Sequence, residues 1–185
     1  MIVTLIRHGA TKGNLEKRYI GSRTDEPLLK SSKEMLGRIT YPSVRQVFTS
    51  PMLRCRETAA ILYPDISPRI IPDFRECDFG AFENKNYEDL CDDACYQAWI
   101  DSGGNLPFPD GESRAEFAAR SLAAFRSLLP DIRRIPSAII AHGGTIMSIM
   151  ECYARPPRDY FEYQVRNGEG YNLDIDSGYF IAIPG

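Results

Sequence analysis

The chain has 185 residues, of which 43% are hydrophobic and 25% charged, and its formal net charge is −3. This balance is typical of one ordinary globular domain and excludes a dedicated nucleic-acid or membrane-surface binder, which would carry a strong basic excess. No run approaches the roughly 18 apolar residues of a membrane span, and the apolar run at 2–6 is too short for a secretion signal. We therefore expect one domain over residues 1–185, located in the cytoplasm.

Five short segments predict strands, because each is rich in β-branched or aromatic residues and is bounded by chain breakers. They cover residues 2–6, 45–49, 68–72, 137–142 and 179–183. Helical patterns lie between them, and such alternation favours a parallel sheet. We expect an α/β fold, a three-layer α/β/α sandwich with a mostly parallel central sheet and helices on both faces. Ligand sites in such sheets lie beyond the carboxyl ends of the strands.

Three helices are predicted from their first residues or from their apolar spacing. Ser50 and Pro51 suit the N-cap and first turn of a helix that continues through "MLRCRETAAILY". A capping box of Ser113 and Glu116 precedes "RAEFAARSLAAFRSLL", which has apolar residues at helical spacing. A third helix is predicted over residues 86–101.

The five cysteines are expected to be reduced thiols, since the chain shows no export signal and an odd number cannot all pair. Cys91 and Cys95 lie four residues apart on a predicted helix, a spacing that could hold a metal ion. However, the only two histidines belong to other motifs, so packing is the preferred interpretation of this pair.

Two predicted strands end in almost the same way. The first runs into Arg7-His8-Gly9 and the fourth into His142-Gly143, so both histidines of the chain fall at the ligand edge of the sheet. Each is followed by glycine, which lets the backbone approach a ligand closely. A single histidine at such a place is ordinarily structural, but two at one edge favour a functional site.

Arg54, one turn into the helix after the second strand, would add a second guanidinium to that of Arg7. Arginine binds phosphate in a bidentate manner and stays charged, and a helix start after His142 offers further amide donors. These groups favour a site for a small tetrahedral oxyanion. Glu76 follows the third strand, and taken alone it would be interpreted as a surface carboxylate.

These motifs resemble, in their order, those of the histidine phosphatase superfamily, the phosphoglycerate mutase-like group. "LIRHGATKGN" is similar to the family's nucleophile motif, "SPMLRCRETA" to its second-arginine motif, and "FRECDFGAFE" to its acid motif. "PDGES" resembles a loop signature and "AHGGTI" the second-histidine motif. The ordered set extends from residue 5 to residue 146 and is far more specific than any one motif.

The resemblance implies a covalent mechanism that needs no metal and no cofactor. His8 would attack phosphorus and carry the phosphoryl group as phosphohistidine. Arg7, Arg54 and His142 would surround the phosphoryl oxygens and stabilise the charge that spreads over them. Glu76 would act as general acid on the departing oxygen and then as general base for the attacking water.

Further positions are implied to bind the substrate. Asn14 and the amide of Gly143 would donate to the phosphate, and Arg18 and Gly21 would contact the substrate near it. Arg18 could equally be a solvent-facing loop charge. The expected partner is a small-molecule phosphate ester, not nucleic acid or membrane, and a homodimer is left open.

The chain departs from the family pattern at several positions. Ala10 stands where Glu is common, and Asn84 stands where Gly often follows the acid motif. The stretch "LLKSSKEMLGR" lacks the usual glycine before its helix, which predicts a shortened or displaced first crossover.

The distance between the acid motif and the second histidine bears on the reaction. Residues 83–112 are predicted to form a small lid, and only 66 positions separate Glu76 from His142. Family mutases carry longer insertions there, which close the pocket against water. We therefore prefer hydrolysis to phosphoryl transfer between sugar phosphates.

Within the family, "RYIGSRTDEPL" resembles a stretch of bacterial alpha-ribazole phosphatases, which act in assembly of the cobalamin nucleotide loop. Related stretches occur in sugar-phosphate phosphatases, and Ser22-Arg23 makes this one a residue longer than expected. The alternatives are a sugar-phosphate phosphatase, a phosphoglycerate mutase-type phosphotransferase, and a catalytically silent binding protein on the same fold. A silent relative would lack one of the reactive His or Arg residues, and none is missing here.

Three other signatures are weaker. "CYARPPR" has the spacing of a cysteine phosphatase loop, but Pro156 and Pro157 lack the N–H groups that such a loop presents to phosphate. "DIDSG" has too few residues after it for an aspartate-nucleophile metal site and is interpreted as a hairpin turn before the last strand. "DFG" lacks every other kinase motif.

Overall fold

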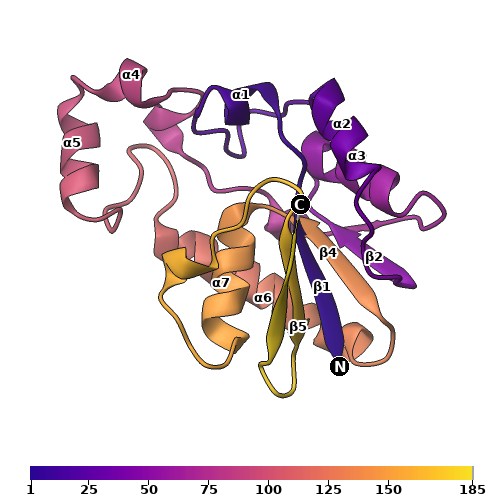
Figure 1. Ribbon diagram of the computed structural model, residues 1–185. Helices are drawn as coiled ribbons and strands as arrows, with labels where there is room; N and C mark the ends of the chain where they lie inside the picture. Colours follow the sequence, from indigo (N-terminus) through magenta and orange to yellow (C-terminus); the bar gives the residue numbers. More distant parts are fainter. Residues whose placement is uncertain (185) are drawn as a thin grey trace.

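Six strands form one mixed sheet at the centre of the computed structural model, which describes residues 1–184 (Figure 1). They are β1 (Ile2–Arg7), β2 (Gln46–Thr49), β3 (Arg69–Ile70), β4 (Ser137–Ala141), β5 (Gly170–Asp174) and β6 (Phe180–Ile183). Their order is β3-β2-β4-β1-β5-β6, and β3, β2, β4 and β1 are parallel. Only β5 runs antiparallel to its neighbours β1 and β6, so the expected mostly parallel sheet is confirmed.

The register of β1 and β4 brings the two histidine motifs together. Arg7 pairs with Ala141, the last residue of β4, and the amide of His8 donates to the Ala141 carbonyl at 3.0 Å. The two parallel strands therefore end at the same level, and His8 and His142 leave the sheet side by side. In Figure 1, the carboxyl ends of both strands point toward the side of the molecule where α1 lies.

Helices cover both faces of the sheet, as expected. They are α1 (Lys12–Leu15), α2 (Lys30–Leu36), α3 (Leu53–Leu62), α4 (Tyr87–Leu90), α5 (Ala94–Asp101), α6 (Arg114–Ile132) and α7 (Gly143–Tyr153), with 3₁₀ turns at Pro72–Phe74, Gly80–Phe82 and Tyr160–Tyr163. Helices α6 and α7 lie on one face, and α3 with α2 beside it lies on the other (Figure 1). None of these helices, over residues 1–184, is long and apolar enough to cross a bilayer.

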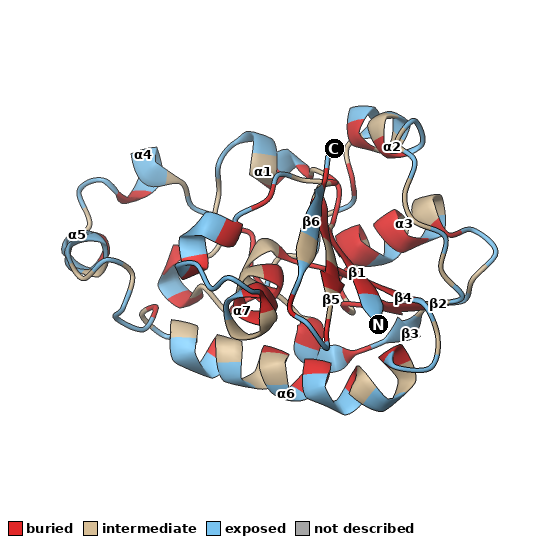
Figure 2. Ribbon diagram, turned by 60° about the horizontal axis from the view of Figure 1, so that its bottom comes forward, coloured by how far each residue is buried: buried red, intermediate tan, exposed pale blue. Residues whose placement is uncertain are grey.

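Alternation along β4 divides the core into two layers. Ile139 and Ala141 pack with the buried residues of α6 and α7, whereas Ala138 and Ile140 pack with those of α3. Every residue of β4 is buried, as expected for a central parallel strand with both faces covered. Figure 2 shows the complementary pattern on α6, where buried and exposed positions alternate along the helix. The α6 capping box of Ser113 and Glu116 is confirmed.

Two predicted helices begin or divide differently in the structure. Helix α3 starts at Leu53 with Met52 as its N-cap, two residues later than predicted. The Ser50 side chain lies before the helix, where its Oγ accepts from the Met52 amide and contacts Nε2 of His142. The single helix predicted over 86–101 is wrong: α4 and α5 replace it.

The break between α4 and α5 has a local cause. The side chain of Asn86 caps α4, and that of Asp93 accepts from two amides at the start of α5. Two N-cap residues within one apolar pattern thus start two short helices. The first crossover helix, α2, has only seven residues, in line with the short crossover expected there.

Strand β5 is the element that the sequence pattern missed. Its sequence, GYNLD, begins with glycine and contains few strand-forming residues. The glycine is required, because a Cβ built on Gly170 would clash with the Leu5 carbonyl oxygen of β1. The turn that follows is the predicted hairpin, with Gly178 at φ +76° and its amide donating to Asp174.

Candidate active site

His8 lies just past the end of β1 and is 3% exposed. Its Nδ1 is 2.7 Å from the carbonyl oxygen of Gly9. A carbonyl only accepts, so Nδ1 carries the ring proton and Nε2 keeps its lone pair. Burial, followed by the charges of Arg54 and Arg7, holds the pKa of His8 well below its usual value. The ring is therefore neutral, with a nucleophilic nitrogen at Nε2.

Two guanidiniums, one fully buried and one partly buried, act on this ring through their charges. Arg54 is fully buried and donates to the carbonyl oxygens of Thr24, Ile20 and Gly21 at 2.9 to 3.2 Å. Arg7 donates to the Val165 carbonyl at 2.7 Å. Over residues 1–184, the Nε of each is buried without a protein partner. Buried donors of this kind are normally satisfied, and an oxyanion would satisfy both.

His142 completes the group from the neighbouring strand. It is fully buried, and its ring centroid lies 5.2 Å from that of His8. Its Nε2 is 2.8 Å from the Ser50 hydroxyl oxygen, and its Nδ1 is 3.6 Å from Oε2 of Glu76. Burial, with Arg54 as the next cause, keeps the pKa of His142 well below its usual value.

Glu76, in the loop after β3, lies beside His142. Burial raises the pKa of its carboxyl above the usual value, although the charge of Arg54 opposes that shift. Because the low pKa of His142 keeps its ring neutral, the contact between the two side chains is not an ion pair. A carboxyl with a raised pKa beside a neutral histidine nucleophile suits general acid catalysis.

A network behind Glu76 holds the acid loop in place. The amide of Cys77 donates to Oε1 of Glu76 at 2.9 Å, and Arg120 of α6 donates to the Glu76 carbonyl at 2.9 Å. Arg120 also forms a bidentate pair with Glu112, with both N–O distances 2.6 Å, and Glu112 accepts from the Asp78 amide. Glu112 lies in the "PDGES" loop signature, which thus has a structural role, whereas no sequence signal distinguished Arg120 from the other charges of α6.

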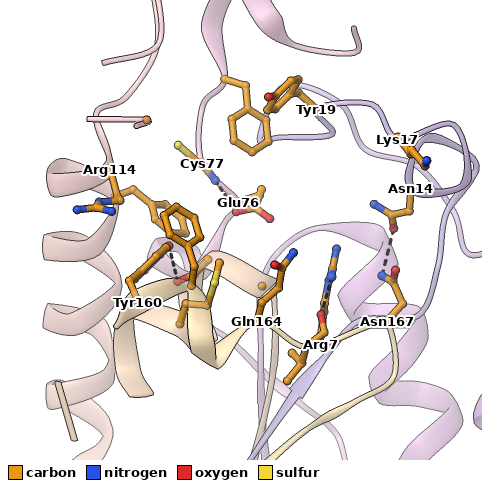
Figure 3. Close-up of a pocket in the computed structure, with 18 of the residues that line it drawn as sticks. Arg7, Asn14, Lys17, Tyr19, Glu76, Cys77, Arg114, Tyr160, Gln164 and Asn167 are labelled. Carbon is orange, nitrogen blue, oxygen red and sulfur yellow. Dashed lines mark hydrogen bonds between the residues drawn. The ribbon is translucent and has the colours of Figure 1, made fainter. Parts of the chain in front are cut away.

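Asn14 lines the cavity and is oriented by a residue that the sequence did not indicate. Asn167 donates through Nδ2 to the His8 carbonyl at 3.0 Å and to Oδ1 of Asn14 at 3.2 Å (Figure 3). The Thr11 amide also donates to that oxygen at 3.1 Å. Because Oδ1 of Asn14 is occupied by donors, its amide NH₂ group is left to donate.

Of the other three positions predicted to bind the substrate, two line the cavity and one does not. Gly143 opens α7 and lines the cavity. Arg18 also lines it, but its guanidinium is paired with Glu16 at 2.8 Å and Asp89 at 2.6 Å. Gly21 is not among the lining residues; its carbonyl accepts from Arg54, so it supports that guanidinium from behind.

A cavity of about 1030 Å³ lies against this group. Arg7, Asn14, Glu76 and Gly143 line it, whereas the buried side chains of His8, Arg54 and His142 are not among its lining residues. Arg7 and Glu76 reach into it from separate segments of the chain (Figure 3). Seven aromatic side chains are also among its lining residues: Tyr19, Phe79, Trp99, Phe108, Phe117, Tyr160 and Phe161. We call Tyr19, Phe79, Trp99 and Phe108 the aromatic wall; two of them, Trp99 and Phe108, come from the predicted lid at 83–112.

The lid segment begins at a backbone position that glycine would fit. Asn84 has φ +58°, in the left-handed region, which explains why the family often has glycine there. The Asn84 carbonyl accepts from Arg18 at 2.7 Å. Arg18 thus ties the start of the predicted lid segment, together with Asp89 of α4, to the loop after α1.

The rival signatures lie away from this cavity. Cys152 is at the C-terminal end of α7, whereas His142 caps its start. Asp174 and Asp176 bind the amino group of Met1 at 2.7 and 2.9 Å, at the opposite end of β1 from Arg7. Cys91 and Cys95 are exposed, and within residues 1–184 no cluster of three His, Cys, Asp or Glu side chains could hold a metal ion.

Comparison with known proteins agrees with this site. Residues 3–182 match the model of the histidine phosphatase superfamily, branch 1. The adenosylcobalamin/alpha-ribazole phosphatase of Salmonella typhimurium is 26% identical, over 97% of this chain and 93% of its own. A probable phosphoglycerate mutase GpmB of an Enterobacter species is 28% identical, over 76% of this chain and 69% of its own.

A solved structure shares the fold over the same extent. The alpha-ribazole phosphatase of Shigella flexneri superposes with a TM-score of 0.81 and 24% identity, covering 97% of this chain and 93% of that chain. The family match spans nearly the whole sequence, including every motif that meets at the cavity. This chain therefore belongs to the histidine phosphatase superfamily, and the phosphatase class expected from its motifs is confirmed at the level of the family.

Proposed function

We propose that this protein is a metal-independent phosphomonoesterase that works through a phosphohistidine on His8. The observation that carries the proposal is the hydrogen bond from Nδ1 of His8 to the Gly9 carbonyl at 2.7 Å. It leaves the Nε2 lone pair free in a ring whose low pKa keeps it neutral. A neutral imidazole with a fixed tautomer is a prepared nucleophile.

In the first step, Nε2 of His8 forms a bond to phosphorus as the bond from phosphorus to the ester oxygen breaks. The unpaired Nε–H groups of Arg7 and Arg54 donate to the phosphoryl oxygens, where negative charge spreads in the transition state. Asn14 and the amide of Gly143 add donors. Glu76, whose pKa is raised by burial, gives its proton to the departing oxygen.

In the second step, water takes the phosphoryl group from His8. Glu76, now ionised, accepts a proton from that water as its oxygen bonds to phosphorus and the bond from Nε2 to phosphorus breaks. The products are an alcohol and inorganic phosphate, and both His8 and Glu76 return to their starting states. None of these steps requires a metal ion.

We propose alpha-ribazole 5′-phosphate as the substrate to test first. Two of the relatives carry alpha-ribazole phosphatase in their names. The aromatic wall supports the choice, because a planar heteroaromatic base would stack there while its ribosyl phosphate reaches His8. Residues 83–112 would act as the lid over this leaving group.

The proposal is tested with a panel of phosphate esters assayed with a chelator present. Alpha-ribazole phosphate, 3-phosphoglycerate and fructose 2,6-bisphosphate are compared for release of inorganic phosphate. We expect the highest kcat/KM for alpha-ribazole phosphate and no loss of rate with the chelator. Loss of activity with the chelator would overturn the metal-free mechanism, and preference for another ester would overturn the substrate.

Phosphoryl transfer is the competing outcome, since another relative is named as a phosphoglycerate mutase. To distinguish the two reactions, enzyme that has been primed with 2,3-bisphosphoglycerate is given 3-phosphoglycerate, and the products are followed by phosphorus NMR. Hydrolysis predicts inorganic phosphate as the main product. Conversion to 2-phosphoglycerate without phosphate release would identify a mutase.

A further inference from the structure

Ser50 does not cap α3 and instead contacts His142. Its Oγ is 2.8 Å from Nε2 of that ring, and both side chains are fully buried. The Met52 amide donates to the same Oγ at 3.3 Å. The thiol of Cys55 is the other group near Nε2, at 3.6 Å.

The direction of the short hydrogen bond follows from counting protons. A hydroxyl has one hydrogen to donate, and the Met52 amide can only donate, so it occupies an Oγ lone pair. The two nearby acceptors for the Ser50 hydrogen are Nε2 of His142 and the Cys55 sulfur, and sulfur is the weaker acceptor. The hydroxyl therefore donates to Nε2, and the ring proton of a neutral His142 lies on Nδ1.

This direction matters because Nδ1 is the nitrogen that faces the reaction. It lies 3.6 Å from Oε2 of Glu76, whereas Nε2 faces Ser50. If the proton were on Nε2, the Nδ1 lone pair would face the phosphoryl oxygens and repel them. A neutral histidine stabilises the transition state only if its proton points at the developing charge.

We infer that Ser50 is a positioning residue: its hydroxyl donates to Nε2 of His142 and thereby fixes the ring proton on Nδ1, where it is offered to a phosphoryl oxygen. Its importance for catalysis rests on the proposed function. The tautomer itself is a property of the resting protein and is measured without turnover.

The tautomer is measured by NMR on protein labelled with ¹⁵N in its histidines. The chain has only two histidines, so one variant, His8→Gln, assigns the ring signals. We expect the wild-type His142 ring to show a protonated Nδ1 and an unprotonated Nε2 at neutral pH. A proton on Nε2 would overturn the inference.

Two variants then separate Ser50 from its surroundings. Ser50→Ala removes the donor, so both tautomers should be populated, and kcat should fall by about 10- to 100-fold with a smaller change in KM, the size of loss seen when a partner that orients a metal-bound histidine is removed. Cys55→Ala removes the other neighbour of Nε2 and should leave the tautomer unchanged. Ser50→Thr retains a hydroxyl and should retain the Nδ1 proton.

The outcomes distinguish this inference from the proposed function. If Ser50→Ala keeps the wild-type tautomer, the inference is wrong whether or not activity falls, since Ser50 would then have only a packing role. If Cys55→Ala shifts the tautomer and Ser50→Ala does not, the thiol is the positioning group instead. If the tautomer behaves as expected but no phosphohistidine forms in the wild type, the proposed function fails and the role of Ser50 on His142 stands.

Discussion

The proposed phosphate-binding end of the site and its proposed leaving-group end, the aromatic wall, are held in different ways. At the phosphate end, His8, Arg54 and His142 are almost fully buried, and each is fixed by directional hydrogen bonds. At the leaving-group end, Tyr19, Phe79 and Trp99 are only partly buried and contact one another mainly edge to face. The first end tolerates few residue types at each position, whereas the second needs only aromatic area.

This difference predicts two classes of variant. Changes at the phosphate end should alter the rate for every ester, because all substrates share the phosphoryl group. Changes in the aromatic wall should alter discrimination between esters and leave the chemical step nearly unchanged.

The largest effect is expected for His8→Ala. Removal of a covalent nucleophile should lower kcat by about four orders of magnitude or more on all esters. The measurement is phosphate release from p-nitrophenyl phosphate and from alpha-ribazole phosphate, with circular dichroism to check folding. Retention of more than a few per cent of activity by folded protein would show that His8 is not the nucleophile.

Glu76→Gln should have the next largest effect. General acid–base help is worth about 10²- to 10⁴-fold, so kcat/KM should fall by that factor for alkyl esters. The loss should be smaller for p-nitrophenyl phosphate, whose leaving group needs no proton. Equal losses on both esters would contradict the role of general acid.

The pH profile provides a second test of Glu76. Its pKa is raised and that of His8 lowered, and the active form needs Glu76 protonated and His8 neutral. In the wild type, kcat/KM should fall as pH rises through the Glu76 pKa and as pH drops through the His8 pKa. Glu76→Gln should lose the fall on the high-pH side.

The sequence predicted His8 and His142 because they stand in short motifs at the ends of strands. Arg7-His8 and His142 follow apolar runs directly, and the parallel pairing of Arg7 with Ala141 suffices to bring them together. Ser50 and Asn167 were not predicted as site residues. Ser50 resembles an ordinary N-cap in sequence, and Asn167 acts from the loop before β5, far away in the chain.

The leaving-group end was predicted only as a region. Residues 83–112 were expected to form a lid, but the helix boundaries within it were wrong because Asp93 starts a new helix. Contacts such as Phe79 with Phe108, at 4.9 Å between ring centroids, depend on the tertiary fold and have no periodic signal. The aromatic wall therefore could not be predicted residue by residue.

Trp99→Leu, a change in the aromatic wall, should have a moderate effect on KM. Loss of aromatic contact is worth about 0.5–1.5 kcal/mol, which corresponds to a rise in KM of roughly 2- to 10-fold for alpha-ribazole phosphate. KM for glycerol phosphate should be nearly unchanged. The only tryptophan of the chain also lines the cavity, so its fluorescence should change when alpha-ribazole binds the wild type. Equal rises in KM for both esters would contradict selective stacking.

Arg18→Ala should have the smallest effect on the phosphate end. Arg18 is engaged by Glu16, Asp89 and the Asn84 carbonyl in exposed pairs, so its loss should loosen residues 83–112 only slightly. We expect faster hydrogen exchange in α4 and little change in inhibition by inorganic phosphate. A weakening of phosphate inhibition beyond about tenfold would instead identify Arg18 as a direct phosphate ligand.

The covalent intermediate is the most direct test of the proposed mechanism. Wild-type enzyme is mixed with ³²P-labelled ester, quenched in alkali during turnover, digested and sequenced by mass spectrometry. We expect an acid-labile, base-stable phosphoryl group on His8, increased in Glu76→Gln when an activated ester is used, because hydrolysis of the intermediate is slowed. Turnover with no label on the protein, or label on His142 instead of His8, would contradict the mechanism.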